Sequence, residues 1–275
     1  MNERSTLDAK RYRPALSRAG LKPTQNIQAR NENGEIIDLQ LPNEYPLTLY
    51  IDGSEVVTLM TMGARPEELA LGYVRNQRLI KDLTSIKSVT VNWQRESVHL
   101  LTHQHAAVGD WHARTERRIV TSGCAQGSIF SSTLAEFEAL QLQPRSVSQE
   151  EIYALVAAVS KRNDIYRQSG GVHGCALCLD DEVLIHIEDV GRHNAADAIA
   201  GYMWLEGIEG EGKSFYTTGR LTSEMVIKCA FMGISVLLSR SSVTYMGYQM
   251  AQKHGLTIVS RVRGKHYLLC SPPGL

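Results

Sequence analysis

The last third of the chain alternates short apolar runs with amphipathic segments, and this alternation limits the folds open to it. Apolar runs of strand length stand at 214–218, 234–239 and 256–262, and helical patterns fill 223–232 and 243–254. A βαβαβ order joins parallel strands through right-handed crossovers and places helices on the faces of the sheet. This part of the chain therefore predicts an α/β domain.

Polar residues follow each of these expected strands at its carboxyl end. Hydroxyl groups, guanidinium groups and glycines bind phosphate well, and helix N-termini nearby present unpaired N–H groups. In sheets of this kind ligands bind beyond the carboxyl ends of the strands. The three loops are 217–220, 239–242 and 261–265. We therefore expect a phosphate or diphosphate site at this edge.

The charge of the whole chain restricts how such a site can work. There are 29 Lys and Arg residues and 29 Asp and Glu residues, so an anion site has to be local and no net charge favours nucleic acid. The apolar stretches are shorter than a membrane span, and residues 1–33 are too polar for a signal peptide. We expect a cytoplasmic protein that binds neither nucleic acid nor membrane.

Residues 188–197 concentrate charge where a buried strand runs into a helix. They follow the apolar run 183–187 and surround Gly191 with acids, an arginine, a histidine and an asparagine. Functional groups collect at such junctions, so Arg192 and His193 are candidates to bind a ligand. In the alternative interpretation, Asp189 or Asn194 caps the helix, and Arg192 and His193 are solvated.

The first half of the chain favours β-structure. Apolar runs flank Asp52-Gly53, a strong hairpin signal, and Pro66 opens a helix that extends to Asn76. Strands are expected at 86–93 and 97–102, and helices at 131–140 and 148–162. The organisation expected has three parts: a polar, loosely ordered extension at 1–40, a β-rich domain at 41–145 that ends in the loop around Cys124, and an α/β domain at 146–275.

The five cysteines are an odd number in a mid-sized chain, which favours free thiols over a disulfide framework. Cys175 and Cys178 have the Cys-x-x-Cys spacing found in zinc sites and redox dithiols. The runs 172–179 and 183–187 predict a hairpin, and strand residues three apart point to opposite faces. We therefore expect two buried, apolar thiols and no metal ion.

Cys124 stands in a different setting. Gly123 and Gly127 flank it, and the basic pair Arg117-Arg118 precedes it. Positive charge and solvent access lower the pKa of a thiol and favour thiolate chemistry. The residues leave two alternatives open: a reactive cysteine, or a thiol buried in a tight turn.

Several segments together resemble the FdhD/NarQ family of formate dehydrogenase accessory sulfurtransferases. The resemblance covers roughly residues 45–269. Its most specific parts are Gly170-Gly171-Val172-His173, residues 188–195, residues 218–228, and residues 255–259 with Arg263-Gly264.

This resemblance implies a protein that accepts persulfide sulfur from a cysteine desulfurase. It would pass that sulfur to the molybdenum cofactor with two molybdopterin guanine dinucleotides, which formate dehydrogenase needs. The resemblance also implies a cytidine-deaminase-like α/β/α domain with a smaller β-rich N-terminal domain, and a homodimer. The deaminase zinc pattern is absent from the sequence, so no intrinsic metal is expected.

The family's persulfide cysteine corresponds to Cys124, and its cofactor-binding segment corresponds to Arg261, Val262, Arg263, Gly264, Lys265 and His266. Arg192, His193 and Arg220 are further candidates to hold the cofactor, and Lys228 is a weaker one. The chain departs from the family in having Gly127 where a second loop cysteine is common. A disulfide within the loop is therefore impossible, although one thiolate can still carry a persulfide.

Three functions remain open at this point. The first is a sulfurtransferase with Cys124 as nucleophile, whose client is the catalytic subunit of formate dehydrogenase. The second is a chaperone that binds the molybdenum cofactor without sulfur transfer. This alternative stays open because Gly127 stands where a second loop cysteine is common in the family. The third is a guanine-nucleotide-binding domain with neither role.

Overall fold

The alternating pattern of the last third folds as predicted, into the parallel centre of a six-stranded sheet. Its strands are β12 (Lys213–Thr217), β13 (Val236–Ser239) and β14 (Thr257–Arg263). β13 pairs in parallel with both of the others. The helices between them are α7 (Ser223–Phe231) and α8 (Tyr245–Lys253). The parallel pairing brings the three expected polar loops to one edge of the sheet.

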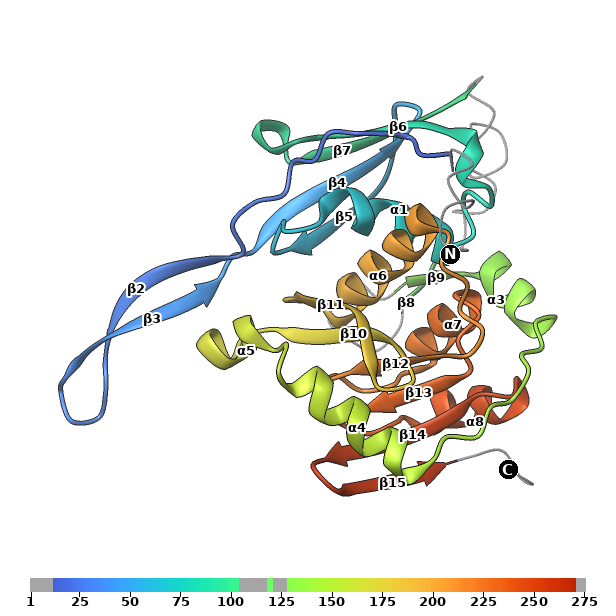
Figure 1. Ribbon diagram of the computed structural model, residues 1–275. Helices are drawn as coiled ribbons and strands as arrows, with labels where there is room; N and C mark the ends of the chain where they lie inside the picture. Colours follow the sequence, from blue (N-terminus) through green and yellow to red (C-terminus); the bar gives the residue numbers. More distant parts are fainter. Residues whose placement is uncertain (1–11, 104–117, 121–127, 271–275) are drawn as a thin grey trace, which may run out of the picture.

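Antiparallel strands complete this sheet on both sides, in the order β11-β10-β12-β13-β14-β15. The computed structural model describes residues 12–103, 118–120 and 128–270 (Figure 1). β10 (His173–Leu179) and β11 (Glu182–Asp189) form the predicted hairpin, and β15 (His266–Cys270) pairs with β14. α6 (Arg192–Glu206) follows β11 directly. The C-terminal layer thus has a mixed sheet with a parallel centre.

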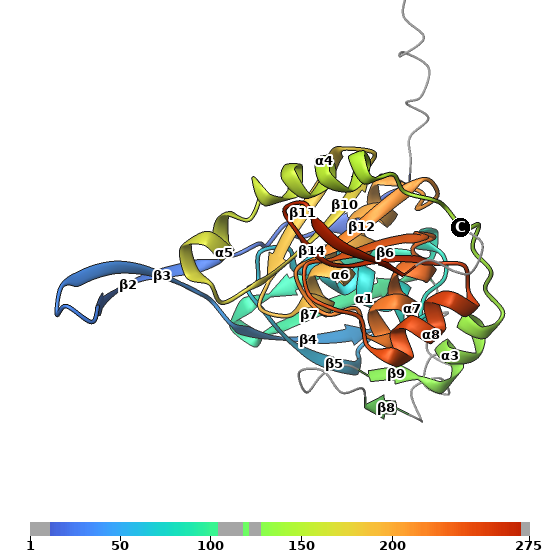
Figure 2. The same ribbon diagram turned by 90° about the horizontal axis from the view of Figure 1, so that it is seen from below.

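Helices cover both faces of the C-terminal sheet. On one face α4 (Gln149–Ser160) buries Ile152, Leu155 and Val159 against the strands. On the other face lie α6, α7 and α8, as Figure 2 shows from below. The remaining helices of this layer are α3 (Ser131–Glu138) and the short α5 (Asp164–Ser169). The predicted α/β fold class is confirmed, and the likeness to cytidine deaminases stays a prediction.

The N-terminal layer is a five-stranded sheet with strand order β1-β6-β7-β4-β5. Asp52 and Gly53 have φ angles of 47° and 87°, as the predicted two-residue hairpin turn requires. The strands are β1 (Ala15–Leu16), β4 (Tyr45–Ile51), β5 (Ser54–Thr61), β6 (Ile86–Asn92) and β7 (Ser97–Thr102). Two 3-10 turns, Leu83–Ser85 and Trp93–Arg95, flank β6. β8 (Arg118–Val120) and β9 (Ser128–Phe130) form a separate two-stranded sheet.

The two layers meet along two helices, α1 (Pro66–Asn76) and α6, whose backbones touch. A Cβ atom on Gly72 would lie 1.6 Å from the carbonyl oxygen of Asp197, and one on Gly201 would lie 1.9 Å from that of Glu68. One hydrophobic core therefore runs through both layers. Phe137 of α3 packs on Phe231, and Glu136 of the same helix pairs with Arg78 and Lys81, so α3 contacts both layers.

The N-terminal segment differs from its prediction. Residues 1–11 lie outside the described part, but β2 (Thr24–Arg30) and β3 (Ile36–Pro42) form an antiparallel ribbon that projects from the body (Figure 1). Within the expected extension 1–40, residues 24–30 and 36–40 are therefore strand. The apolar residues of β3 alternate with polar ones at 37–41, a pattern that the polar composition around it hides.

The hairpin of β10 and β11 places the paired cysteines on opposite faces, as predicted. Cys175 packs in the core beneath α6, whereas Cys178 packs in the core beneath α4. Both side chains are fully buried, and burial raises the pKa of each thiol to about 12. Neither thiol therefore forms a thiolate at neutral pH.

Replacing Cys175 with Ala and Cys178 with Val should reduce stability without changing the fold. The cost expected is about 1 kcal/mol for each site, because small apolar groups replace small apolar groups. Urea unfolding of the double variant measures this loss. A cost of several kcal/mol for either site would give these thiols a role beyond packing.

Gly201→Ala should destabilise the protein by about 3 kcal/mol or more, because the new methyl group collides with the backbone of α1. Helix propensity alone predicts the opposite sign, a gain of about 1 kcal/mol. Thermal and urea unfolding decide between the two signs. An unchanged or raised stability would show that α1 and α6 are less closely packed than described.

Candidate functional site

The charged segment at 188–197 lies where β11 ends and α6 begins, and most of its polar groups are engaged within the fold. Glu188 accepts hydrogen bonds from the backbone N–H groups of Ile165 and Tyr166, both at 2.9 Å. These are two of the N–H groups that the N-terminus of α5 leaves unpaired. Glu188 therefore fixes α5 against the end of the sheet.

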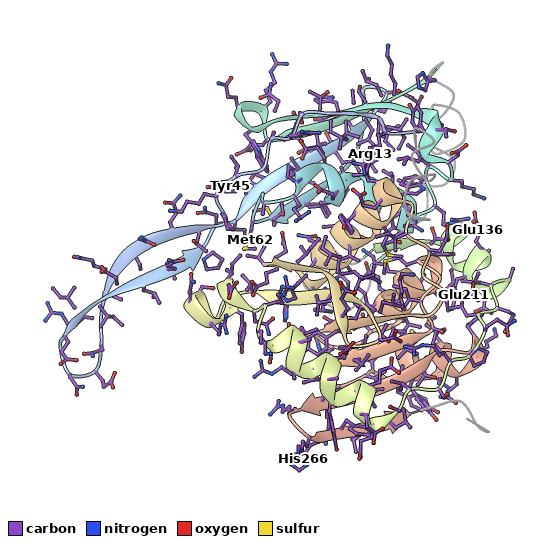
Figure 3. The ribbon with its side chains drawn as sticks, viewed as in Figure 1. Arg13, Tyr45, Met62, Glu136, Glu211 and His266 are labelled. Carbon is purple, nitrogen blue, oxygen red and sulfur yellow. The ribbon has the colours of Figure 1, made fainter. Side chains whose placement is uncertain are left out.

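Asp189 joins the C-terminal layer to the N-terminal sheet. Its Oδ2 atom accepts hydrogen bonds from the Thr61 hydroxyl at 2.6 Å and from the Met62 N–H at 3.2 Å. Its Oδ1 atom accepts from the Gly191 N–H at 3.1 Å and from the Asn194 amide at 3.0 Å. Figure 3 shows Met62 at the boundary between the layers. Burial raises the pKa of Asp189, and these four donors oppose the rise.

Asp197, in α6, forms the centre of a second buried network, with partners from α1 and α7. Lys228 donates to its Oδ2 atom at 2.6 Å, and Asn76 donates to its Oδ1 atom at 2.8 Å. Glu224 lies 3.4 Å from the same ammonium group. Burial alone lowers the pKa of Lys228, but the two carboxylates more than reverse this and hold the ammonium charged. The ammonium group of Lys228 is therefore engaged in buried ion pairs, which makes Lys228 a poor candidate for binding a cofactor.

Arg192 is buried, with an exposed fraction of 4 %, and so is not solvated as in the alternative interpretation. Its Nε and Nη2 atoms have no hydrogen-bond partner among the described residues. The side chain lies over Gly219, where a Cβ atom would come within 2.6 Å of Cδ. A buried guanidinium with two free donors is costly unless an anion pairs with it.

His193 is also largely buried. It helps to line a hollow of about 260 Å³ between the two layers, which we call the junction hollow. Its Nε2 atom lies 3.5 Å from Glu224. Burial lowers the pKa of His193 to about 3, despite the nearby Glu224, so the imidazole is neutral at pH 7. His193 can exchange hydrogen bonds but cannot balance a negative charge.

A second hollow, of about 360 Å³, opens at the carboxyl ends of β12, β13 and β14. We call it the carboxyl-edge hollow. It holds polar residues from all three predicted loops, so the expectation that these loops share one edge is confirmed. Its lining residues are Tyr166, Gly170, Gly171, Val172, His173, Val190, Thr218, Arg240, Ser241 and Arg263.

Positive charge dominates the surroundings of the carboxyl-edge hollow. Arg240 lies over the ring of Tyr166, 5.5 Å from its centroid. Burial lowers the pKa of His173, and the charges of Arg192 and Arg220 lower it further. The positive charge of both arginines is therefore felt at His173, which lines this hollow. The hollow is therefore suited to an anionic group with an attached aromatic ring.

The segment at 261–266 does not face one space, and here the structure differs from the prediction. Arg261, Lys265 and His266 line a third hollow beside Tyr153, whereas Arg263 lines the carboxyl-edge hollow. Figure 3 shows His266 at the outer end of the C-terminal layer.

The reason for this division is local. β14 continues through this segment into a hairpin with β15, and the pairing shifts between Ser260 and Arg263. Arg261 has a φ angle of 53°, and Gly264 has one of 58° in the turn. Val262 is 1 % exposed and packs beneath α4, so its side chain belongs to the core. A bulge of this kind redirects the side chains that follow it.

The remaining predicted residues fall into two groups. Arg220 is exposed beside Gly219, and its charge reaches His173. Cys124 lies outside the described residues. Sequence reasoning did not place Tyr166 and His173 at the site; the Gly170-Gly171 pair between them was the available signal, because adjacent glycines favour close approach of a ligand.

The described helices include none that is both long and apolar enough to cross a membrane. Within the same residues, no cluster of three or more His, Cys, Asp or Glu side chains has the arrangement of a metal site.

Comparison with known proteins gives a consistent result. Residues 42–274 match the model of the FdhD/NarQ family. The chain is 30% identical over 251 residues to a protein of Bacillus subtilis named sulfur carrier protein FdhD, with 89% of this chain and 94% of that protein covered. It is 29% identical over 232 residues to a protein of the same name from Shouchella clausii, with 83% and 86% covered.

A solved structure agrees with these relatives. The crystal structure of a protein from Desulfotalea psychrophila, described as a formate dehydrogenase accessory protein, superposes with a TM-score of 0.71 at 25% identity. The match covers 91% of this chain and 97% of the other. Because the family model spans most of the chain and the relatives align along nearly their whole length, this protein belongs to the FdhD/NarQ family.

Proposed function

We propose that this protein is a cytoplasmic sulfur carrier that passes persulfide sulfur from a cysteine desulfurase to the molybdenum cofactor with two guanine dinucleotides. The client is the catalytic subunit of formate dehydrogenase. The names of the relatives support the sulfur-carrier role. The observation that supports the cofactor part of the proposal is the buried Arg192, which has two donor atoms without a partner among the described residues and whose charge acts on His173 in the wall of the carboxyl-edge hollow.

The chemistry of the carboxyl-edge hollow supports a diphosphate ligand. Arg240 and Arg263 can each donate from a planar guanidinium, and Thr218 and Ser241 add hydroxyl donors. Arg192 can complete the set if an anion reaches it, since its buried Nε and Nη2 atoms have no hydrogen-bond partner in the described part of the chain. Tyr166 presents a ring to a purine or pterin. A guanine dinucleotide supplies both the charge and the ring.

The sulfur-transfer step assigned to Cys124 conserves electrons. The Cys124 thiolate attacks the terminal sulfur of the donor persulfide, a new S–S bond forms, and the donor's S–S bond breaks with its thiolate leaving. Release of that sulfur as sulfide to molybdenum then needs two electrons. A thiol reductant supplies them by forming a disulfide with Cys124 as the terminal sulfur leaves.

A cofactor chaperone without sulfur transfer is the second candidate, and Gly127 is the observation that favours it. With no second cysteine in the loop, Cys124 cannot be regenerated through a disulfide inside that loop. The two functions share the anion site and differ only at Cys124. Labelling of the cysteines therefore separates them.

Cys124 should be the only cysteine that a cysteine desulfurase converts to a persulfide. Burial raises the pKa of Cys175, Cys178 and Cys229, which leaves these thiols protonated and enclosed. Mass spectrometry after incubation with the desulfurase and sulfur-34 cysteine locates the label. Cys270, which is partly exposed, is the internal control for nonspecific reaction. Label on other cysteines with none on Cys124 would exclude the carrier mechanism.

Arg263→Ala should weaken GDP binding about tenfold to a hundredfold, because a charge-assisted hydrogen bond contributes about 1.5 to 3 kcal/mol. GDP serves here as a fragment of the cofactor, and calorimetry measures its affinity. Arg261→Ala is the matched control: it removes the same group two residues away, from a different hollow, and should leave the affinity unchanged. Salt should weaken binding to the wild type.

The reverse result has a definite meaning. If Arg261→Ala weakens GDP binding and Arg263→Ala does not, the diphosphate lies in the hollow beside β15, and the assignment to the carboxyl-edge hollow is wrong. Equal affinities for wild type and both variants would remove the diphosphate from this part of the chain altogether.

A further inference from the structure

The short helix α5 brings Tyr166 to the wall of the carboxyl-edge hollow. The ring lies against Arg240, whose guanidinium carbon is 5.5 Å from the ring centroid. A cation over the face of an aromatic ring is attracted to it. Among the described residues that line this hollow, Tyr166 is the only Phe, Tyr or Trp. Any stacking of a ligand's ring in this hollow therefore depends on where α5 holds Tyr166.

Packing in the core does not hold α5 in place. The helix has six residues, all of them described by the structure, and none of the six is buried. Helices shorter than about 12 residues are marginal in water, so α5 depends on contacts with the rest of the chain. β3 lies against it at the base of the projecting ribbon (Figure 1). The other support comes from the end of β11.

Two side chains on one face of β11 hold the start of α5. His186 and Glu188 are two residues apart in the strand, so they point to the same face of the sheet. The Nε2 atom of His186 lies 3.0 Å from the Oδ1 atom of Asn163, the N-cap residue of α5. Asparagine at this position usually accepts a hydrogen bond from the first turn of its own helix. Within the described residues Asn163 makes no such bond, and its oxygen contacts β11 instead.

Glu188 supplies the missing cap from a different element. Its two carboxylate oxygens each accept one backbone hydrogen bond, from the N–H groups of Ile165 and Tyr166, both at 2.9 Å. The positive end of the helix dipole favours a carboxylate at this place. One of the two donors is the N–H group of Tyr166 itself. The carboxylate therefore fixes the backbone that carries the ring.

We propose that Glu188 is a positioning residue for nucleotide recognition: by holding the start of α5, it keeps the Tyr166 ring where it can stack on the base of a nucleotide whose diphosphate the arginines bind. This inference rests on the proposed function and adds a selectivity to it. The site should favour a diphosphate that carries an aromatic base, because stacking on an aromatic side chain strengthens binding about tenfold.

Calorimetry of the full chain with two ligands tests the role of the ring. The ligands are GDP and methyl diphosphate, which has the diphosphate ester of GDP without its base and sugar. Tyr166→Ala should weaken GDP binding about tenfold, because it removes the stacking surface. It should leave the affinity for methyl diphosphate unchanged. Tyr166→Phe is the matched control: it keeps the ring and should bind GDP as wild type does.

Glu188→Gln tests the role of the anchor. It should weaken GDP binding about threefold to tenfold, because the amide keeps one acceptor oxygen and turns an NH₂ group toward the second backbone N–H. Methyl diphosphate binding should not change. Glu182→Gln makes the same substitution at the exposed other end of β11 and should change neither affinity. Glu188→Asp, which keeps the charge on a shorter arm, repeats the test if Glu188→Gln does not fold.

A double variant shows whether Glu188 acts through the ring. Glu188→Gln combined with Tyr166→Ala should bind GDP as Tyr166→Ala does, to within about twofold, because the anchor has no ring left to place. Hydrogen exchange gives a reading without any ligand. The amides of Ile165 and Tyr166 should exchange faster in Glu188→Gln than in wild type, whereas Glu182→Gln should leave both rates unchanged.

Three results would overturn the positioning role and leave the diphosphate site in place. They are an unchanged GDP affinity in Glu188→Gln, an equal loss of affinity for both ligands, and a loss in the double variant equal to the sum of the two single losses. A wild type that binds neither ligand would instead overturn the anion site of the proposed function, and the positioning role with it.

Discussion

The buried carboxylate of Asp189 connects the two layers, and the position of the candidate site depends on it. The group accepts four hydrogen bonds, two from the end of β5 and the residue after it, and two from the start of α6. Burial penalises its charge, and the donors compensate. Removing any one donor would leave part of that penalty uncompensated. The close contact of α1 with α6 at Gly72 and Gly201 then fixes the angle at which the layers meet.

This junction decides which residues of the charged segment remain available to a ligand. Asn194 donates to Asp189 and to the Met60 carbonyl, and Asp197 is enclosed by Lys228 and Asn76. Arg192 and His193 are adjacent in sequence, yet the charge of Arg192 acts on His173 in the wall of the carboxyl-edge hollow, whereas His193 lines the junction hollow with Asp197 and Glu224. The start of α6 thus lies between the carboxyl-edge hollow and a buried ion network.

Much of the fold could be predicted because its signals are local. The βαβαβ pattern and the Asp52-Gly53 turn each depend on residues within one or two elements. The ribbon at 24–42 was missed because β2 contributes only Ile27 and Ala29 to the apolar face of the ribbon, and the pattern becomes clear only when β3 is set beside it. Tyr166 and His173 were missed as site residues for a related reason. They reach the carboxyl-edge hollow from segments distant in sequence from Thr218, Arg240 and Arg263, and the role of Cys124 stays a prediction.

The sequence by itself determined the order of strands and helices, the edge of the sheet where polar loops gather, and the opposite orientation of Cys175 and Cys178. These follow from side-chain periodicity, which is a property of each segment alone. Only the tertiary structure decided that Arg261 and Arg263 face different hollows, because the bulge in β14 depends on its pairing with β15. It also decided that Arg192 is buried with two guanidinium nitrogens that no described residue pairs with, since a charge becomes costly only when packing removes the water around it.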